Sequence, residues 1–357
     1  MGRWWRYKWI TFHPSLTKTS ESSFRDCHAI GRLCDNPRRY WSRKNPGFRR
    51  ETPYGFRPRK SAQQALREIY KWLNFKCHWV VDADLKAYFD TIPHDKLLLS
   101  VRSKVIDRSV VKLIEMWLTA GVMEDMRLRR ETTGTPQGGV ISPLLANLYL
   151  HWLDHSWEMK SFGKRPHNAH IVRYADDFVI LCKENPEFYL KQAKKVLDRL
   201  GLTLNAQKTR VVNAREEPFG FLGHRFTVQP SKLTGKLKTY YYPAPKAMKS
   251  IKRKIREVVR TGQHWNLPQL IKEKVNPILR GWGNYFKTGN SRKHFLSIAN
   301  YTTWTLCIML RKKHKKRTKG WRDHPPSWFY EYHGLFKIYS LSVTGGESSR
   351  YARPVPL

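Results

Sequence analysis

The sequence is poor in cysteine, in acidic residues and in long apolar runs, and each shortage narrows what the protein can be. It has five cysteines and no Cys-x-x-Cys pair, which argues against a disulfide framework and favours a reducing compartment. It has no run of 18 apolar residues, so no membrane-spanning segment is expected. Because 40% of the residues are hydrophobic, the chain is expected to bury a core rather than to be disordered throughout.

The shortage of acidic residues leaves a large positive charge. Asp and Glu number 28 against 67 Lys and Arg, so the formal net charge of the 357 residues is +39. Such a surface repels itself unless a polyanion neutralises it, and nucleic acid is the leading candidate because each phosphate contact releases counterions. The 17 Tyr, 16 Phe and 14 Trp suit base stacking as well as core packing. The composition therefore predicts a nucleic-acid-binding protein.

Two apolar segments carry carboxylates where strands are expected. Residues 170–182 have the pattern of a β-hairpin with Asp176 and Asp177 at or near its turn. Residues 79–85 have the pattern of a strand whose two aspartates face away from its apolar positions. Neighbouring carboxylates repel each other and need cations, and Mg²⁺ binds one or two carboxylates plus substrate phosphates. The pattern favours a two-metal phosphoryl-transfer site, bridged by Asp84 and Asp176, over an ordinary Asp-rich turn.

After about residue 243 the chain becomes helical and basic. Apolar residues recur at helical spacing between Ala247 and Val259, and basic residues coat the other faces. Such a helix can lie on a membrane surface, but in a chain this basic a helix that follows phosphates is the better interpretation. Two further helices are expected, around residues 267–282 and 292–311. The residues expected to contact RNA are Lys249, Lys252, Arg253, Arg256, Lys312 and Lys313.

Several motifs together resemble those of the group II intron reverse transcriptases, or maturases. Tyr-Ala-Asp-Asp at 174–177 resembles the palm signature of polymerases, and residues 135–147 resemble the intron enzymes' motif nearly residue for residue. The resemblance covers about residues 54–340. Further matching blocks, the last resembling the maturase domain that grips intron RNA, lie at residues 54–58, 84–90, 205–209, 221–223 and 277–286.

The resemblance implies an α+β fold, in which a right-hand polymerase palm (an antiparallel sheet with packed helices) is followed by an α-helical thumb or maturase domain. The family's fingers motifs are missing ahead of residue 54. The implied domains are an irregular basic segment at 1–53, a fingers remnant and palm at 54–235, the helical thumb at 236–310 and a basic aromatic tail at 311–357.

The function implied by the resemblance is that of an RNA-directed DNA polymerase, a nucleotidyltransferase, that also binds intron RNA in splicing and mobility. The alternative is a maturase-type RNA-binding protein whose polymerase activity has decayed because the fingers are missing. The implied partners are an intron RNA template, a DNA primer or target and deoxynucleoside triphosphates, with no membrane. Whether the chain forms a homodimer is left open, and the expected location is the cytoplasm of a bacterium.

The resemblance also assigns the site residues. Asp84, Asp176 and Asp177 are the implied catalytic carboxylates that bind two Mg²⁺ ions, with Asp177 the weaker ligand and Asp82 beside the site.

The implied substrate residues lie around these carboxylates. Phe89 is the implied steric gate against ribonucleotides, with Tyr88 beside it, unless both belong to the palm core. Lys208 is expected to support the incoming phosphates or to lie on the surface. The backbone expected to approach the template and the incoming nucleotide is that of Gln137, Gly138 and Gly139.

Overall fold

A computed structural model describes most of the chain between residues 53 and 341, and the description covers residues 53–57, 59–119, 122–124, 127–129, 134, 141–164, 167–314 and 320–341. The expected irregular segment at 1–53 therefore lies almost wholly outside the described residues, and the expectation that it lacks fingers motifs stays a prediction. The chain divides into two units, the first made of Met1–Trp72 and Trp79–Val211 and the second of Leu73–His78 and Val212–Leu357.

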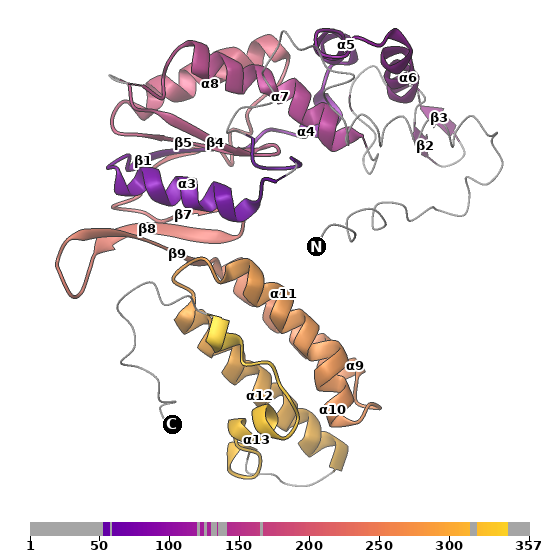
Figure 1. Ribbon diagram of the computed structural model, residues 1–357, viewed down its shortest axis with the longest axis vertical. Helices are drawn as coiled ribbons and strands as arrows, with labels where there is room; N and C mark the ends of the chain where they lie inside the picture. Colours follow the sequence, from indigo (N-terminus) through magenta and orange to yellow (C-terminus); the bar gives the residue numbers. More distant parts are fainter. Residues whose placement is uncertain are drawn as a thin grey trace. The chain divides into compact units, whose positions relative to one another are not determined.

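A four-stranded sheet forms the centre of the first unit (Figure 1). Its strand order is β4-β5-β1-β6. Both β4 and β1 pair antiparallel with β5, with Tyr174 opposite Asp177 and Ala83 opposite Phe178. The expected hairpin at 170–182 is thus confirmed, and so is the strand that begins at residue 79. The strands are β1 Trp79–Ala83, β4 His170–Tyr174, β5 Asp177–Cys182 and β6 Arg210–Asn213, within which the first unit ends.

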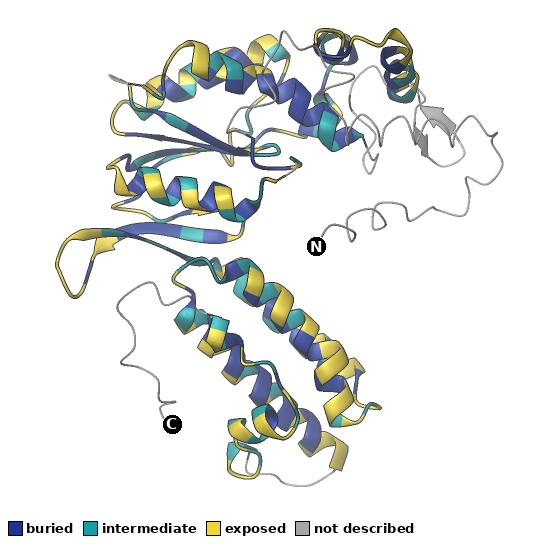
Figure 2. Cartoon of the chain, in the orientation of Figure 1, coloured by how far each residue is buried: buried dark blue, intermediate teal, exposed yellow. Residues whose placement is uncertain are grey.

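Helices cover both faces of this sheet. Helices α7 (Ser142–Met159) and α8 (Pro186–Leu200) lie on one side, and α3 (Ala62–Asn74) lies on the other (Figure 1). The sheet is buried between these layers, because apolar side chains of both faces pack into the core (Figure 2). The remaining elements of the unit are α4 Tyr88–Thr91, α5 His94–Arg102, α6 Arg108–Thr119, β2 Val122–Glu124 and β3 Arg127–Arg129.

The start of α7 differs from what its sequence predicts. A Ser-Pro pair is typical of an N-cap followed by a first-turn proline, which predicts the cap at Ser142. The helix instead begins at Ser142 itself, which is buried, and Ile141 holds the cap position. Pro143 still lies in the first turn, where its missing N–H costs nothing. The apolar spacing along this helix also predicts that Trp152 is buried, but it is 38% exposed, and its indole N–H donates a hydrogen bond to Ser100 Oγ at 3.0 Å.

The second unit joins a small antiparallel sheet to a set of helices. The sheet has the order β7-β8-β9, and the apolar face of α9 buries Ile251, Ile255 and Val259. The helix expected around 267–282 begins with a short α-helical turn, passes through a π-helical segment and becomes α-helical again. The elements are β7 Phe219–Phe221, β8 His224–Pro230, β9 Leu237–Pro243, α9 Pro245–Thr261, α10 Leu267–Gln269, the π-helix Leu270–Val275, α11 Asn276–Phe286, α12 Arg292–His314, the 3₁₀ turns Gly320–Arg322 and Ile338–Leu341, and α13 Pro326–Glu331.

The structure describes two features that the sequence has little of, long apolar segments and cysteines. No helix among the described residues is long and apolar enough to cross a membrane. The cysteines that the structure describes, Cys77, Cys182 and Cys307, are buried and form no disulfide bonds.

A buried ion pair joins α7 to the hairpin of the first unit. Arg173 on β4 is fully buried, and its guanidinium donates to both carboxylate oxygens of Asp154 on α7. It also donates to Asn147 Oδ1 at 3.1 Å and to the carbonyl of Ala175, in the hairpin turn, at 2.8 Å. Asn147 in turn donates to the carbonyl of Gly55 at 2.8 Å. One guanidinium therefore fixes the positions of α7, the hairpin turn and the segment at residue 55.

We predict that Asp154→Ala strongly destabilises the first unit. The substitution leaves the Arg173 guanidinium buried without its counter-charge, which costs about 3–5 kcal/mol in the free energy of unfolding. Urea denaturation measures the change. The matched control is Glu115→Ala, which breaks the exposed 3.6 Å pair with Arg102 and should cost below about 1 kcal/mol. Equal effects of the two substitutions would contradict the structural role given to Arg173.

Candidate active site

The turn of the β4–β5 hairpin presents the first candidate carboxylates. Because Tyr174 pairs with Asp177, the turn consists of Ala175 and Asp176. Ala175 has a φ of 58°, the left-handed conformation that two-residue hairpin turns require and that costs a non-glycine residue free energy. Gly55 packs against this turn, since a Cβ at residue 55 would lie 2.6 Å from the Ala175 backbone nitrogen. The turn is therefore held by a backbone contact as well as by Arg173.

The end of β1 brings further carboxylates to the same edge of the sheet. Ala83 pairs with Phe178 on β5, so Asp84, which follows β1, comes next to Asp177, which begins β5. Asp82 alternates with buried neighbours and is half-buried, as the strand pattern predicted. Asp82, Asp84 and Asp176 each act on the charge of Asp177. The sequence predicted these carboxylates on separate segments, and the fold brings those segments together.

The electrostatic signature of this group is a raised pKa at Asp177. Partial loss of hydration, followed by repulsion from Asp176, Asp84 and Asp82, raises its pKa from 3.8 to about 6, and Lys208 opposes the shift. The side chain still reaches solvent, which screens part of the repulsion. Burial also raises the pKa of Asp82, against the attraction of Arg210. The surroundings of both carboxylates thus disfavour the charged form, first of all through loss of hydration.

Basic and amide side chains from the segment after α8 contact the carboxylates. Lys208 Nζ lies 3.2 Å from Asp84 Oδ2, and Asn205 Nδ2 donates to the same oxygen at 3.3 Å. Arg210 Nε lies 3.4 Å from Asp82 Oδ2. Lys208 has 66% of its side chain exposed, so its ammonium can leave Asp84 for another anion at little cost. Asn205 lies in a matching sequence block, but its role in orienting Asp84 was missed because only the folded chain brings them together.

The substrate residues expected from the sequence lie in two environments. Tyr88 is buried, and its hydroxyl donates to the Ala146 carbonyl at 2.6 Å. Phe89 is half-buried against the core and meets the Tyr88 ring edge-on, with centroids 5.4 Å apart. The assignment of Phe89 as the gate remains a prediction, as does that of Tyr88. The expected backbone contacts of Gln137, Gly138 and Gly139 lie outside the described residues.

The carboxylate group fits a divalent cation. The residues described by the structure contain no ready-made cluster of three or more His, Cys, Asp or Glu ligands. Mg²⁺ does not require one, because it keeps several waters and takes one or two carboxylates plus substrate phosphates. Loss of hydration, followed by repulsion from the neighbouring carboxylates, disfavours the charged form of Asp177, and a cation would relieve the repulsion. Asp84, Asp176 and Asp177 are the side chains suited to hold it.

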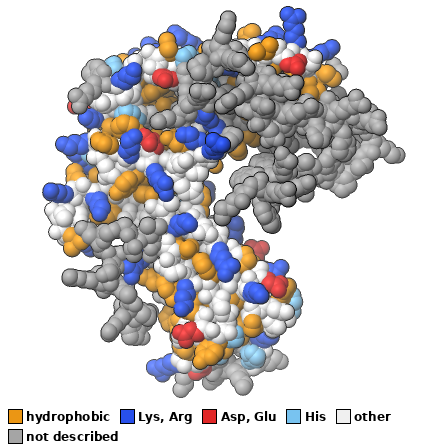
Figure 3. Space-filling model, in the orientation of Figure 1, with side chains coloured by type: hydrophobic (Ala, Val, Ile, Leu, Met, Phe, Trp, Pro, Cys, Tyr) orange, Lys and Arg blue, Asp and Glu red, His pale blue; other side chains and the backbone are white. Residues whose placement is uncertain are grey.

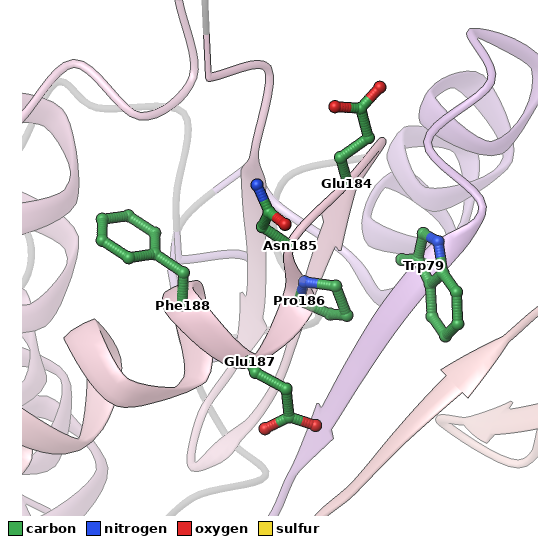
Figure 4. Close-up of a pocket in the computed structure, with 6 residues that line it drawn as sticks. All are labelled: Trp79, Glu184, Asn185, Pro186, Glu187 and Phe188. Atoms are coloured by element: carbon green, nitrogen blue, oxygen red, sulfur yellow. The ribbon is translucent and has the colours of Figure 1, made fainter.

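The surface also has a hollow lined by Trp79 and residues 184–188 (Figure 4). Trp79 begins β1, whereas the carboxylates follow its other end, so the hollow and the carboxylates lie at opposite ends of the strand. Figure 4 shows its labelled side chains spread around the rim, and two of them, Glu184 and Glu187, would repel phosphate. The hollow is therefore separate from the candidate site.

The predicted RNA-binding residues lie on two helices of the second unit. Lys249, Arg253 and Arg256 are exposed on α9, whereas Lys252 is half-buried. Lys252 Nζ lies 5.3 Å from the centre of the Tyr301 ring. The exposed Lys312 and Lys313 lie in the last turn of α12, where Lys313 Nζ donates to the Trp265 carbonyl at 2.7 Å. Figure 3 shows Lys and Arg side chains over the visible surface of each unit.

The raised pKa of Asp177 predicts a pH-dependent stability in metal-free buffer. The folded protein binds this proton more tightly than the unfolded chain, so the contribution to stability is full below pH 3.8 and is lost as the pH rises through about 6. Asp177→Asn should remove this part of the fall in unfolding free energy, measured by urea denaturation with EDTA present. Asp198→Asn, on an exposed side chain of α8, should keep it. Identical pH profiles for Asp177→Asn and wild type would refute the assignment.

Comparison with known proteins agrees with this geometry. Residues 48–226, half of the chain, match the reverse transcriptase (RNA-dependent DNA polymerase) family, and residues 248–325 match the group II intron maturase-specific domain. An apo telomerase structure from Candida tropicalis gives a TM-score of 0.41 at 16% identity, covering 60% of this chain and 45% of that one. The fold assignment depends on the family match and the antiparallel palm-like sheet rather than on this weak likeness.

Curated relatives come from bacteria and fungi. The group II intron-encoded protein LtrA of Lactococcus lactis subsp. cremoris is 30% identical over 251 residues, 53% of this chain and 42% of that protein. An uncharacterized 91 kDa protein in the cob intron of Schizosaccharomyces pombe is 29% identical over 339 residues, 73% of this chain and 41% of that protein. Protein YkfC of Escherichia coli K12 is 31% identical over 213 residues, 50% of this chain and 56% of that protein.

This chain thus spans about half the length of the curated relatives that it matches. The mixture of bacterial and fungal relatives leaves the expected bacterial source and cytoplasmic location as predictions. The two family matches identify the family: the chain belongs to the reverse transcriptases and carries a group II intron maturase-specific domain.

Proposed function

We propose that this protein is an RNA-directed DNA polymerase of a group II intron that also binds intron RNA in splicing and mobility. The observation that carries the proposal is the meeting of carboxylates from β1 and from the β4–β5 turn at one edge of an antiparallel sheet. Reverse transcriptases use divalent metal ions, and the two matched domains imply nucleic-acid partners. The template is intron RNA, and the other substrates are a DNA primer or target and deoxynucleoside triphosphates.

The carboxylates supply the metal-binding part of the site. Asp84 and Asp176, with Asp177 as a weaker third, hold two Mg²⁺ ions, which when bound favour ionisation of the primer 3′-hydroxyl and neutralise the triphosphate. Asn205 fixes the orientation of the Asp84 carboxylate by its 3.3 Å hydrogen bond. Lys208, now 3.2 Å from Asp84, is mobile enough on its exposed stem to meet the incoming phosphates.

Other side chains shape the space around the nucleotide. Phe89 is half-buried and presents an apolar ring that excludes a ribose 2′-hydroxyl. Tyr88 supports it from the core, because its own hydroxyl is anchored on the Ala146 carbonyl. The approach of Gln137, Gly138 and Gly139 to the template and the incoming nucleotide stays a prediction from the sequence. The palm occupies residues 54–235 and the thumb residues 236–310, with a basic tail at 311–357.

The second unit supplies RNA affinity in this proposal. Helix α9 carries seven basic residues and one acidic residue, Glu257. Its apolar stripe is used for the core, so the basic side chains are left to face phosphates. Lys312 and Lys313 extend the positive surface at the end of α12.

Size-exclusion chromatography with and without RNA will show whether two copies of the chain associate.

We predict that Asp176→Asn abolishes primer extension on a poly-rA template with an oligo-dT primer. Loss of one carboxylate disrupts metal binding, whereas RNA affinity should change less than about two-fold because the basic helices are untouched. Asp198→Asn is the exposed, charge-matched control and should extend primers like wild type. Extension by Asp176→Asn at the wild-type rate would remove the assignment. A wild-type chain that binds RNA but extends nothing would favour the alternative, a maturase-type protein with decayed polymerase activity.

We further predict a steep salt dependence of RNA binding. Each phosphate neutralised contributes about 0.7–0.9 to the slope of log affinity against log salt. Replacing Lys252, Arg253 and Arg256 together by Gln should lower the slope by about 2–3. Filter binding at a series of KCl concentrations gives the slope. The control is a triple Gln variant of Lys191, Lys194 and Lys195 on α8, which should leave it unchanged. A flat wild-type titration would contradict the role of α9.

A further inference from the structure

One face of α12 carries a mixed aromatic and basic surface. Tyr301, Trp304, Ile308 and Arg311 recur at intervals of three and four residues, so they lie on the same side of the helix. Trp304 is 48% exposed and Ile308 is 40% exposed. Most large apolar side chains of α12 are instead buried in the core of the second unit. We call these four residues the Trp304 surface.

Trp304 is exposed and yet braced in place. The Trp321 ring meets it edge-on, with centroids 5.7 Å apart and an interplanar angle of 79°. Gly320, with a φ of +66°, approaches so closely that a Cβ there would lie 3.0 Å from Cζ3 of Trp304. Only a residue without a Cβ adopts this conformation and this approach without strain. The indole is therefore supported from one side while much of its surface remains open to solvent.

Basic side chains border the same surface. Helix α9 packs against α12, and Lys252 Nζ lies 5.3 Å from the centre of the Tyr301 ring. Arg256 Nε donates to the Tyr301 hydroxyl at 3.2 Å. Beyond Trp304, the exposed Arg311 and Lys312 continue the positive charge to the end of the helix. A polyanion lying along this face would thus meet cations on both sides of the exposed indole.

We propose that Trp304 is a stacking platform for an unpaired base of the bound RNA, with Lys252, Arg256 and Arg311 holding the flanking phosphates. The proposal rests on the proposed function, since it places RNA on the second unit. Stacking needs a free base face, which single-stranded RNA offers and a continuous duplex hides. The cations favour RNA over a protein partner, because an apolar protein surface would have to desolvate them.

The test compares two RNAs of equal phosphate number, one single-stranded and one fully paired, by filter binding to the full chain. Trp304→Ala should weaken single-strand binding about five-fold or more and change duplex binding less than about two-fold. The salt slope should stay the same, because no phosphate contact is lost. Tyr332→Ala, which removes an aromatic ring that is 76% exposed elsewhere in the unit, is the control and should change neither affinity.

Two further variants separate stacking from folding and from simple apolar contact. Trp304→Phe keeps a π-face and should retain most of the single-strand affinity, whereas Trp304→Leu keeps an apolar side chain without one and should lose it. Equal affinities for Phe and Leu, or equal losses on both RNAs, would overturn the platform. Unchanged RNA binding in all three variants would also overturn it and leave the surface to a protein partner. In each case a steep wild-type salt slope would show that RNA binding itself stands, whereas a flat one would refute the proposed function.

Discussion

The buried ion pair between Arg173 and Asp154 is the constraint on which the first unit depends. An unpaired charge in a protein core is so costly that the guanidinium must keep its partners. These are Asp154 and Asn147 on α7 and the Ala175 carbonyl in the hairpin turn. Through Asn147 the same network reaches Gly55. Three segments distant in sequence are therefore held in one arrangement, and the position of Asp176 follows from it.

Charged side chains a few residues apart, Arg173 and the carboxylates at the edge of the sheet, have opposite surroundings. The buried Arg173 guanidinium donates four hydrogen bonds, whereas at the edge of the sheet loss of hydration, followed by repulsion from neighbouring carboxylates, raises the pKa of Asp177. Repulsion of this kind lowers stability, and proteins keep it where a ligand relieves it. The rigid network beneath the turn allows the carboxylates to stay close together before a cation arrives, so metal binding need not reorganise the backbone.

The sequence predicted the elements whose residues repeat with a clear period. The alternation of Asp82 and Asp84 with apolar residues located β1, and the apolar spacing between Ala247 and Val259 located α9. The buried role of Arg173 could not be predicted, because its partners come from α7 and the segment at Gly55. The π-helical segment was also missed, since one extra residue per turn hardly disturbs an apolar pattern over six residues. Contacts between distant segments, rather than local preference, therefore decide the role of Arg173.

The absence of a side chain at Gly55 has a mechanical consequence. Because the backbone of residue 55 touches the backbone of Ala175, no flexible side chain lies between them to absorb a displacement. The hydrogen bond from the Tyr54 amide to the Arg173 carbonyl, at 2.9 Å, stiffens the same joint. A displacement of the chain at residues 53–55 would therefore move the β4–β5 turn directly, because no flexible side chain separates the two backbones. Whatever binds that segment gains a means of shifting Asp176 without touching the site.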